Sequence, residues 1–308
     1  MVQRGAFLLM AAALVLGISR IPAPAPAPEP SAPDDVVYVY NGYAAKTDAA
    51  FDTDSLDRAA YRFRHLYDLY FTGRTIFLAV VPDKAQFTVP PEGYTPAGAA
   101  ETADYLCGAL DFLTPVDIAA GLTLADYYRT DPHWRQEYLQ PAVEAILTAM
   151  GAPVPDRTEE TLNALAGGFR GSYWGKTAET LEPDTLAYLT SPVLEGCTVY
   201  DYETGSTGGV YDFNAAEAAP YDLFLGGSKS LLRIENPAAA GDSTLIVFRD
   251  SFGSSLVPLL AESYRTVYVA DIRYMATDAL ARVVDFPKDA DVLLVYSATV
   301  LQNSITLK

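Results

Sequence analysis

A serine at the end of an apolar segment is the first candidate for chemistry in this chain. Ser251 follows the run Ser243-Thr-Leu-Ile-Val-Phe248, which predicts a buried strand, and precedes a stretch that predicts a helix. A serine at such a junction lies at the carboxyl edge of a sheet, where open α/β folds bind ligands, and the first N–H groups of the helix can face an oxyanion. Gly253 allows close approach of the backbone. Asp250 and Ser251 would equally make an ordinary helix N-cap, so this pattern alone leaves both interpretations open.

A serine nucleophile needs a general base, and the chain contains two histidines, His65 and His133. His65 lies in the middle of an expected helix, which favours a structural role. His133 follows Asp131 and Pro132, and the proline biases Asp131 toward extended backbone, in which residues i and i+2 point to the same side. The Asp131 carboxylate can then orient the His133 imidazole and stabilise its protonated form. The alternative is that Asp131 and Pro132 simply begin the helix that follows.

Helical and strand patterns alternate around these motifs. Helices are predicted over 54–70, 102–113, 133–150, 256–264 and near 277–284, and strands over 75–81, 243–248, 266–270 and 291–296. This alternation predicts one α/β domain with a parallel central sheet covered on both faces. The segment 151–240, rich in Gly, Pro, Thr and Tyr, is expected to form long loops and a hairpin around Gly226 and Gly227, as one wall of a cleft.

The composition excludes some classes of partner. With 39 acidic and 21 basic residues the formal net charge is -18, so nucleic acid is a poor partner, because binding it requires a basic face. The two cysteines, Cys107 and Cys197, match no metal-site spacing. Buried free thiols are favoured over a disulfide, although an oxidising compartment would permit one. We expect neither a metal nor a cofactor.

The first residues are typical of an export signal. An apolar run over 6–18 stands between Arg4 and Arg20, which suits a signal peptide and is short for a membrane span. A Pro/Ala-rich stretch follows. We therefore expect a signal peptide or N-terminal membrane anchor over 1–21, a linker over 22–35 and a catalytic domain over 36–308, located outside the cytoplasm. A buried N-terminal helix is the alternative.

Taken together, the motifs resemble those of the DHHW-motif proteins of bacterial envelopes. They are more distantly similar to those of the periplasmic alginate O-acetyltransferases, which carry an SGNH-hydrolase-like domain. The resemblance runs through residues 81–84, 128–134, 169–172, 221–227, 250–253 and 269–274. It implies an α/β, SGNH-hydrolase-like three-layer fold with a parallel central sheet, in which the motif order is permuted so that D-x-H precedes the serine. It also implies that Asp131 orients, His133 acts as base and Ser251 is the nucleophile.

The chain departs from the family pattern at two positions. Pro132 replaces the first histidine of D-H-H-W, which leaves the Asp/His pair intact, and Ser228 stands where the family often has asparagine after a glycine pair. The candidates for oxyanion or substrate binding are Gly226, Gly227, Gly253, Arg273, Tyr274 and Trp134. Arg273 could hold a substrate anion or pair with Asp271. Trp134 could stack on a sugar ring or pack in the core.

These observations predict extracytoplasmic O-acyl (acetyl) transfer to a cell-envelope polysaccharide through an acyl-enzyme on Ser251. The resemblance implies a membrane-bound O-acyltransferase as the partner that supplies acetyl groups. One alternative is a carbohydrate esterase of SGNH type, with the same three residues and water as acceptor. Another is a non-catalytic glycan-binding module.

Overall fold

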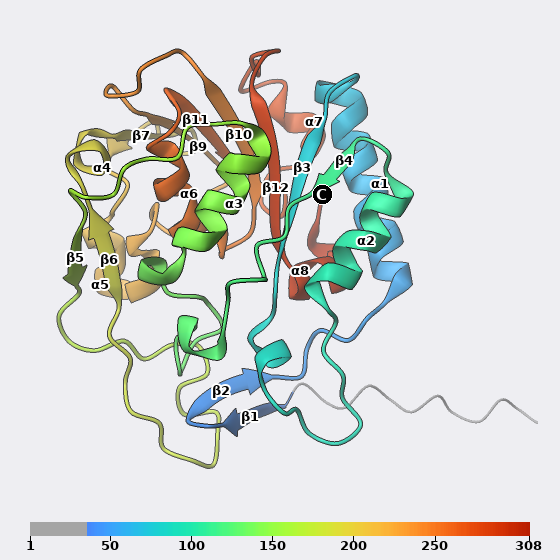
Figure 1. Ribbon diagram of the computed structural model, residues 1–308, viewed down its shortest axis with the longest axis vertical. Helices are drawn as coiled ribbons and strands as arrows, with labels where there is room; N and C mark the ends of the chain where they lie inside the picture. The colour runs from blue at the N-terminus through green and yellow to red at the C-terminus, as the bar shows by residue number, and fades with distance from the viewer. Residues whose placement is uncertain (1–35) are drawn as a thin grey trace, which may run out of the picture. The chain divides into compact units, whose positions relative to one another are not determined.

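An eight-stranded sheet lies at the centre of the structure, a computed structural model that describes residues 36–308 (Figure 1). The strand order is β4 (Leu113–Pro115), β3 (Ile76–Val81), β12 (Asp291–Ser297), β10 (Thr244–Arg249), β11 (Thr266–Ala270), β9 (Leu231–Glu235), β7 (Thr198–Asp201) and β8 (Thr207–Gly208). Strands β4 to β11 in this order run parallel. Strands β9, β7 and β8 extend the sheet with antiparallel pairing. The predicted signal or anchor segment (1–21) and linker (22–35) lie outside the described residues and stay predictions.

The central strands are apolar on both faces because helices cover both. In β10, Leu245 and Val247 belong to one hydrophobic cluster, while Ile246 and Phe248 belong to the other. This alternation follows from the two-residue period of a strand. A strand buried in this way reads as a continuous apolar run, which is why β10 and β12 can be recognised in the sequence.

Helices pack on the two faces of the sheet. One face is covered by α3 (Gln140–Met150), α4 (Pro192–Gly196) and α6 (Gly253–Ala261). The other is covered by α1 (Thr53–Leu66), α2 (Ala99–Ala109), α7 (Thr277–Leu280) and α8 (Ala298–Gln302). The molecule therefore has three layers, and the predicted α/β class with a largely parallel central sheet is confirmed.

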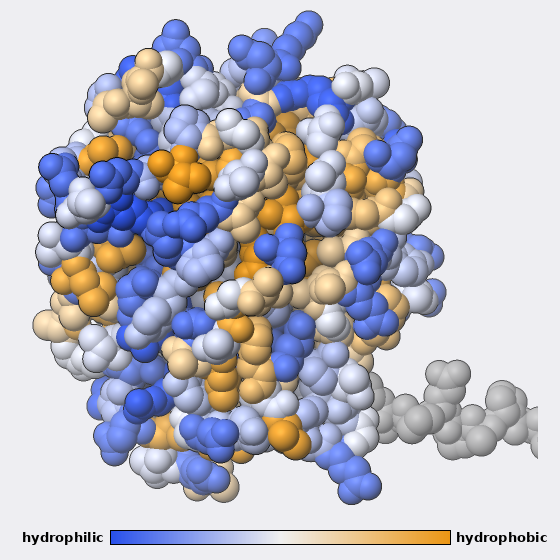
Figure 2. Space-filling view, in the orientation of Figure 1, coloured by the Kyte–Doolittle hydropathy of each residue, from blue (hydrophilic) through white to orange (hydrophobic). Residues whose placement is uncertain are grey.

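Two small hairpins and a short helix complete the fold. The pair β1 (Val37–Tyr40) and β2 (Tyr43–Lys46) and the pair β5 (Thr161–Ala164) and β6 (Ala187–Thr190) are antiparallel. Helix α5 (Phe213–Ala218) precedes a turn that leads into β9. On the face seen in Figure 2, apolar side chains gather between α2 and α3 among hydrophilic ones.

Several predicted boundaries are wrong. The helix expected over 133–150 begins only at Gln140, because residues 133–139 form a bridge and a 3₁₀ turn, and Pro141 occupies the first turn of α3. The helix expected over 102–113 spans 99–109, and Leu113 belongs to β4. No hairpin forms around Gly226 and Gly227, because within residues 36–308 the flanking strands β8 and β9 pair with β7 and not with each other.

The two cysteines are free and lie on opposite faces of the sheet. Cys107 packs against the hydrophobic cluster under α1 and α2, and Cys197 belongs to the cluster under α3 and α6. A disulfide between them would need to cross the sheet, so the free-thiol interpretation holds for this fold. Across residues 36–308, no helix has the length and apolar character needed to span a bilayer.

Candidate active site

Ser251 lies in a sharp turn between β10 and α6, which Asp250 holds from both sides. One oxygen of the Asp250 carboxylate accepts the N–H of Phe252 at 3.0 Å, and the other accepts the N–H of Ser297 at 2.7 Å. Ser297 ends β12, the neighbouring parallel strand. Asp250 is fully buried and thus connects the serine turn to the adjacent strand. This fixes the serine at the carboxyl edge of the sheet.

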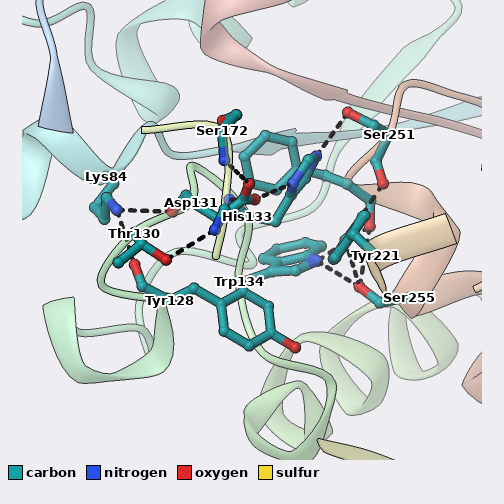
Figure 3. A network of polar contacts seen from close by, with 12 residues as sticks. Lys84, Tyr128, Thr130, Asp131, His133, Trp134, Ser172, Tyr221, Ser251 and Ser255 are labelled. Atoms are coloured by element: carbon teal, nitrogen blue, oxygen red, sulfur yellow. Dashed lines mark hydrogen bonds and ion pairs between the residues drawn. The ribbon is translucent and has the colours of Figure 1, made fainter. Parts of the chain in front are cut away.

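The structure brings Asp131, His133 and Ser251 together in one chain of hydrogen bonds (Figure 3). His133 Nε2 lies 2.8 Å from Ser251 Oγ, and His133 Nδ1 lies 2.5 Å from Asp131 Oδ1. The imidazole is 14% exposed, while the Asp131 side chain is buried. These contacts place an imidazole nitrogen on the serine hydroxyl and a carboxylate on the opposite ring nitrogen, which is the geometry that base-assisted attack by a serine requires.

Both oxygens of the Asp131 carboxylate accept hydrogen bonds. Its Oδ1 also accepts the backbone N–H of His133 at 3.1 Å, and its Oδ2 accepts the N–H of Ser172 at 2.8 Å. Burial raises the pKa of Asp131, but the nearby charge of His133 and these hydrogen bonds outweigh burial and lower the pKa to about 2. Asp131 is therefore ionised throughout the physiological range.

The loop that carries Asp131 and His133 is held by a second carboxylate. Asp184 accepts the N–H groups of Arg129 and Thr130, each at 2.8 Å, and the Thr130 hydroxyl at 2.6 Å. Thr130 Oγ1 in turn accepts the N–H of Gly171 at 3.0 Å. The loop is thereby joined to the segment that supplies Ser172 to Asp131.

Lys84 also binds the loop that carries Asp131 and His133, through its side chain. Its side chain is only 1% exposed, and its Nζ donates to the carbonyl oxygens of Tyr128 at 2.8 Å and of Asp131 at 2.7 Å. Burial lowers the pKa of Lys84 to about 8, although Asp131 and other carboxylates oppose the shift. The sequence assigned no role to Lys84. Lys84 follows the apolar run of β3, so it lies at the same sheet edge as Ser251. This position in the sequence could have identified Lys84 as a neighbour of the site.

Aromatic side chains pack around the imidazole. The Tyr221 ring stacks on the His133 ring with centroids 3.9 Å apart, and its hydroxyl lies 3.1 Å from Ser255 Oγ. Trp134 donates from Nε1 to Phe252 O at 3.0 Å and to Ser255 Oγ at 3.1 Å. Trp134 is fully buried, so its placement among the sugar-stacking candidates is wrong. It fastens the histidine loop to the first turn of α6.

Two of the glycines predicted to bind the oxyanion, Gly227 and Gly253, already use their N–H groups in hydrogen bonds within their own turns. The N–H of Gly227 bonds Phe224 O at 3.2 Å, and that of Gly253 bonds Asp250 O at 3.1 Å. Gly226 and Gly227 have φ values of 70° and 76°, which explains the glycine pair. A Cβ on Gly253 would come within 2.6 Å of Arg249 Cβ, so close packing requires glycine there.

Arg273 and Tyr274 form no contact with the triad within residues 36–308. Of the two interpretations of Arg273, the structure shows the ion pair: its Nη2 lies 2.7 Å from Asp271 Oδ2, and its Nε lies 2.9 Å from Asp271 Oδ1. Tyr274 is exposed, and its hydroxyl bonds Ser228 Oγ at 3.3 Å. The part of the chain that the structure describes contains no group of three or more His, Cys, Asp or Glu side chains suited to a metal ion.

A family model described as "DHHW protein" matches residues 123–270, a range that includes Asp131, His133 and Ser251. The resemblance to DHHW proteins is confirmed. A solved DHHW family protein from Eubacterium siraeum is 24% identical, with 88% of this chain and 92% of that chain covered and a TM-score of 0.69. The comparison with curated protein sequences finds no match.

Two further solved structures share the fold. Bacillus cereus PatB1, solved with a sulfonyl adduct, is 18% identical, with 87% of this chain and 96% of that chain covered and a TM-score of 0.68. The O-acetyltransferase domain of Pseudomonas putida AlgJ is 14% identical, with coverage of 87% and 92% and a TM-score of 0.51. The chain therefore has the SGNH-hydrolase-like three-layer fold that the DHHW resemblance implies.

Proposed function

We propose that this protein transfers acetyl groups to a cell-envelope glycan through an acyl-enzyme, with Ser251 as nucleophile, His133 as base and Asp131 as the carboxylate that orients it. The observation that carries the proposal is the continuous hydrogen-bonded chain from Asp131 Oδ1 through the imidazole to Ser251 Oγ. A buried ionised carboxylate, a partly exposed imidazole and a serine in a sharp strand-to-helix turn are the parts that acyl transfer needs.

The proposed reaction has two halves. Ser251 Oγ attacks the acetyl carbonyl of the donor while His133 Nε2 takes the serine proton, and Asp131 stabilises the resulting imidazolium. The tetrahedral intermediate then expels the donor oxygen, which receives that proton, and the acetyl group remains on Ser251. A glycan hydroxyl next gives its proton to His133 Nε2 and attacks the acyl carbonyl. The intermediate then breaks the bond to Ser251 Oγ, which takes the proton back from His133 as the acetylated sugar leaves.

An N–H donor beside the nucleophile supports the oxyanion step. The N–H groups of Phe252, Gly253 and Ser254 are bonded to Asp250 or Ser251. Among residues 36–308 the Ser251 N–H finds no acceptor, so it is free to face the developing negative charge. We therefore propose Ser251 N–H as one oxyanion donor, with Gly226 at the neighbouring turn as the candidate for a second.

The comparisons favour transfer over hydrolysis. The AlgJ domain, which shares the fold, is described as an O-acetyltransferase domain. PatB1 was obtained with a sulfonyl adduct, and sulfonyl reagents react with activated hydroxyl nucleophiles. On this basis we propose a glycan acceptor. The membrane-bound O-acyltransferase that would supply the acetyl group is proposed from the DHHW resemblance alone.

The proposed function is tested by measuring how the acyl-enzyme divides between transfer to a glycan and hydrolysis by water. Wild-type protein is incubated with p-nitrophenyl acetate with and without glycan oligomers, and acetylated sugar is counted against free acetate. Added glycan should lower acetate release, because the acceptor hydroxyl competes with water for the same intermediate. Free acetate alone with every glycan offered would show an esterase and end the transferase proposal.

Loss of the nucleophile tests the site itself. Ser251→Ala should reduce p-nitrophenyl acetate turnover by roughly three or more powers of ten. Ser243→Ala is the matched control, because Ser243 is exposed just before the opposite end of β10 and contributes only its backbone to described hydrogen bonds. Turnover retained in Ser251→Ala would mean that another group is the nucleophile.

We also propose that the domain over 36–308 acts outside the cytoplasm, with 1–21 as signal or anchor and 22–35 as spacer. The apolar run and the proline-rich stretch in the sequence support this. Fractionation of cells expressing the full chain should place the domain in the envelope or medium. Recovery of the full-length protein from the cytoplasm alone would contradict export.

A further inference from the structure

A cavity that does not include Asp131, His133 or Ser251 lies between the antiparallel edge of the sheet and α5. Figure 1 shows β7 and α5 at its left. The volume of the cavity is about 360 Å³, within the range of small-ligand sites. The side chains that give it chemical character are Asp201, Thr207, Tyr211, Phe213, Asn214 and Lys229. None of these residues takes part in the proposed acyl-transfer chemistry.

The cavity shares a wall with the candidate active site. Gly226 lines the cavity, and the carbonyl oxygen of the next residue, Gly227, accepts a hydrogen bond from Arg249 Nη2 at 3.1 Å. Arg249 ends β10, two residues before Ser251. At the other end of the same segment, Tyr221 stacks on His133. The segment over 221–227 thus contacts both the cavity, through Gly226, and the candidate active site, through Tyr221.

The lining suits a sugar ring. Phe213 is 52% exposed, and its ring contacts that of Tyr188 at a steep angle with centroids 5.8 Å apart. The exposed part of the Phe213 ring can pack against the C–H face of a pyranose. The exposed Asn214 and Thr207 offer amide and hydroxyl groups for sugar hydroxyls. A largely preformed concave site with an aromatic surface and a few polar groups is the usual form of a small-ligand site.

The charges of the cavity select against an acidic sugar. Lys229, its one cationic lining residue among those described, is already paired with Asp201, with Nζ and Oδ2 3.0 Å apart. Asp212 adds a second carboxylate, and Asp222 adds a third beside the turn, where its Oδ1 would be 2.3 Å from a Cβ on Gly227. The full chain carries a formal net charge of -18. A polyuronate would be repelled both locally and at long range.

We infer that this cavity is a subsite for an uncharged, hydroxyl-bearing sugar unit of a neutral glycan acceptor, whose chain passes the 221–227 segment to reach the acetylated Ser251. The inference rests on the proposed acyl transfer and adds to it both the place where the acceptor binds and the class of glycan it belongs to. Phe213 provides the packing surface, and the carboxylates of Asp212 and Asp222 exclude polyanionic chains, since the charge of Asp201 is balanced by Lys229.

Acceptor saturation tests this subsite. Acetyl transfer from p-nitrophenyl acetate is measured against rising concentrations of neutral pentasaccharides (cellopentaose and mannopentaose) and of pentagalacturonate. The half-saturating concentration of a neutral pentasaccharide should rise about tenfold in Phe213→Ala and return toward the wild-type value in Phe213→Trp. Tyr61→Ala removes an aromatic side chain from α1 that is even more exposed, at 67%, and should leave saturation unchanged. Hydrolysis without glycan is measured for each variant, so that damage to the triad is distinguished from loss of acceptor binding.

Charge selection has its own readout. Pentagalacturonate should be a poor acceptor at low ionic strength and improve when salt screens the repulsion. Unchanged neutral saturation in Phe213→Ala would overturn the subsite while leaving acetyl transfer in place. Better use of pentagalacturonate than of the neutral sugars would overturn the charge argument. Absence of transfer to any sugar, with ester hydrolysis intact, would remove both the subsite and the transferase function.

Discussion

Gly171 lies directly against Asp131. A Cβ atom on Gly171 would be 2.2 Å from the Asp131 Cβ and 2.6 Å from the carbonyl oxygen of Thr130. The adjacent residue, Ser172, donates its N–H to Asp131 Oδ2, so the close approach of the two backbones is what delivers this donor. The φ angle of Gly171 lies outside the left-handed region, so its backbone conformation does not require glycine. Glycine is needed there because a larger side chain would collide with Asp131.

Substitution at this position should displace the carboxylate. Gly171→Ala forces either Asp131 or the 169–173 segment to move, at a cost of about 1–3 kcal/mol for overpacking. We expect ester hydrolysis to fall at least tenfold together with a lower melting temperature. Gly108→Ala is the control: Gly108 is exposed in α2 with open space around it, so alanine should stabilise that helix by up to about 1 kcal/mol. Full activity in Gly171→Ala would show that Asp131 does not need its present position.

Lys84 should act as a positioning residue. In Lys84→Met the carbonyl oxygens of Tyr128 and Asp131 lose their buried donor, which costs about 1–3 kcal/mol for each unsatisfied group. We expect kcat for p-nitrophenyl acetate to fall at least tenfold with little change in KM, because the loop shifts while the substrate pocket remains. Lys288→Met, at an exposed lysine, is the control. An unchanged kcat alongside altered stability would limit Lys84 to a structural role.

Tyr221 offers two separable contributions. Tyr221→Phe keeps the ring stacked on His133 but removes the hydroxyl that meets Ser255, whereas Tyr221→Ala removes both. Because the stacked ring restricts the imidazole, we expect Tyr221→Ala to lose at least tenfold more ester hydrolysis than Tyr221→Phe. Steady-state kinetics on the two variants decides this. Equal losses would assign the effect to the hydroxyl alone.

The pKa of Asp131 predicts a pH dependence of stability. Its value of about 2 lies below the ordinary 3.8, so the ionised carboxylate stabilises the folded state at pH above about 4 and loses that contribution as pH falls toward 2. The contribution is about 2 kcal/mol for a shift of this size. Urea unfolding at a series of pH values should therefore show a steeper loss between pH 4 and 2 in wild type than in Asp131→Asn. If the unfolding free energies of wild type and Asp131→Asn fell in parallel between pH 4 and 2, the lowered pKa of Asp131 would be contradicted.

Asp131, His133 and Ser251 could be predicted from the sequence because the residues next to each of them indicate its local structure. Pro132 biases Asp131 away from helical backbone, and the apolar run before Ser251 identifies the sheet edge. The structure has a bend at 130–133, in which Asp131 Oδ1 also accepts the N–H of His133. The start of α3 was misjudged because the apolar pattern continues through Trp134, whose ring packs in the core from a loop and not from a helix.

The supporting residues could not be found in the same way. Lys84, Gly171 and Asp184 each contact the His133 loop from segments about forty to fifty residues away, and such contacts depend on where long connections return. The antiparallel strands β9 and β7 are short and leave no long apolar run. Only the resemblance to DHHW proteins suggested that the segment around residues 169–172 belongs to the site.

The hydrogen bond between His133 and Ser251 joins residues 118 positions apart, and between them lie four of the central sheet's strands, β7, β8, β9 and β10. Contacts of such long range form late in folding, because the entropy of closing the intervening chain must first be offset. A nascent or partly folded chain consequently holds a serine without its base, and the hydroxyl alone is a poor nucleophile. Reactivity is in this way a property of the completed fold, and the appearance of esterase activity during refolding would report the closing of the whole domain.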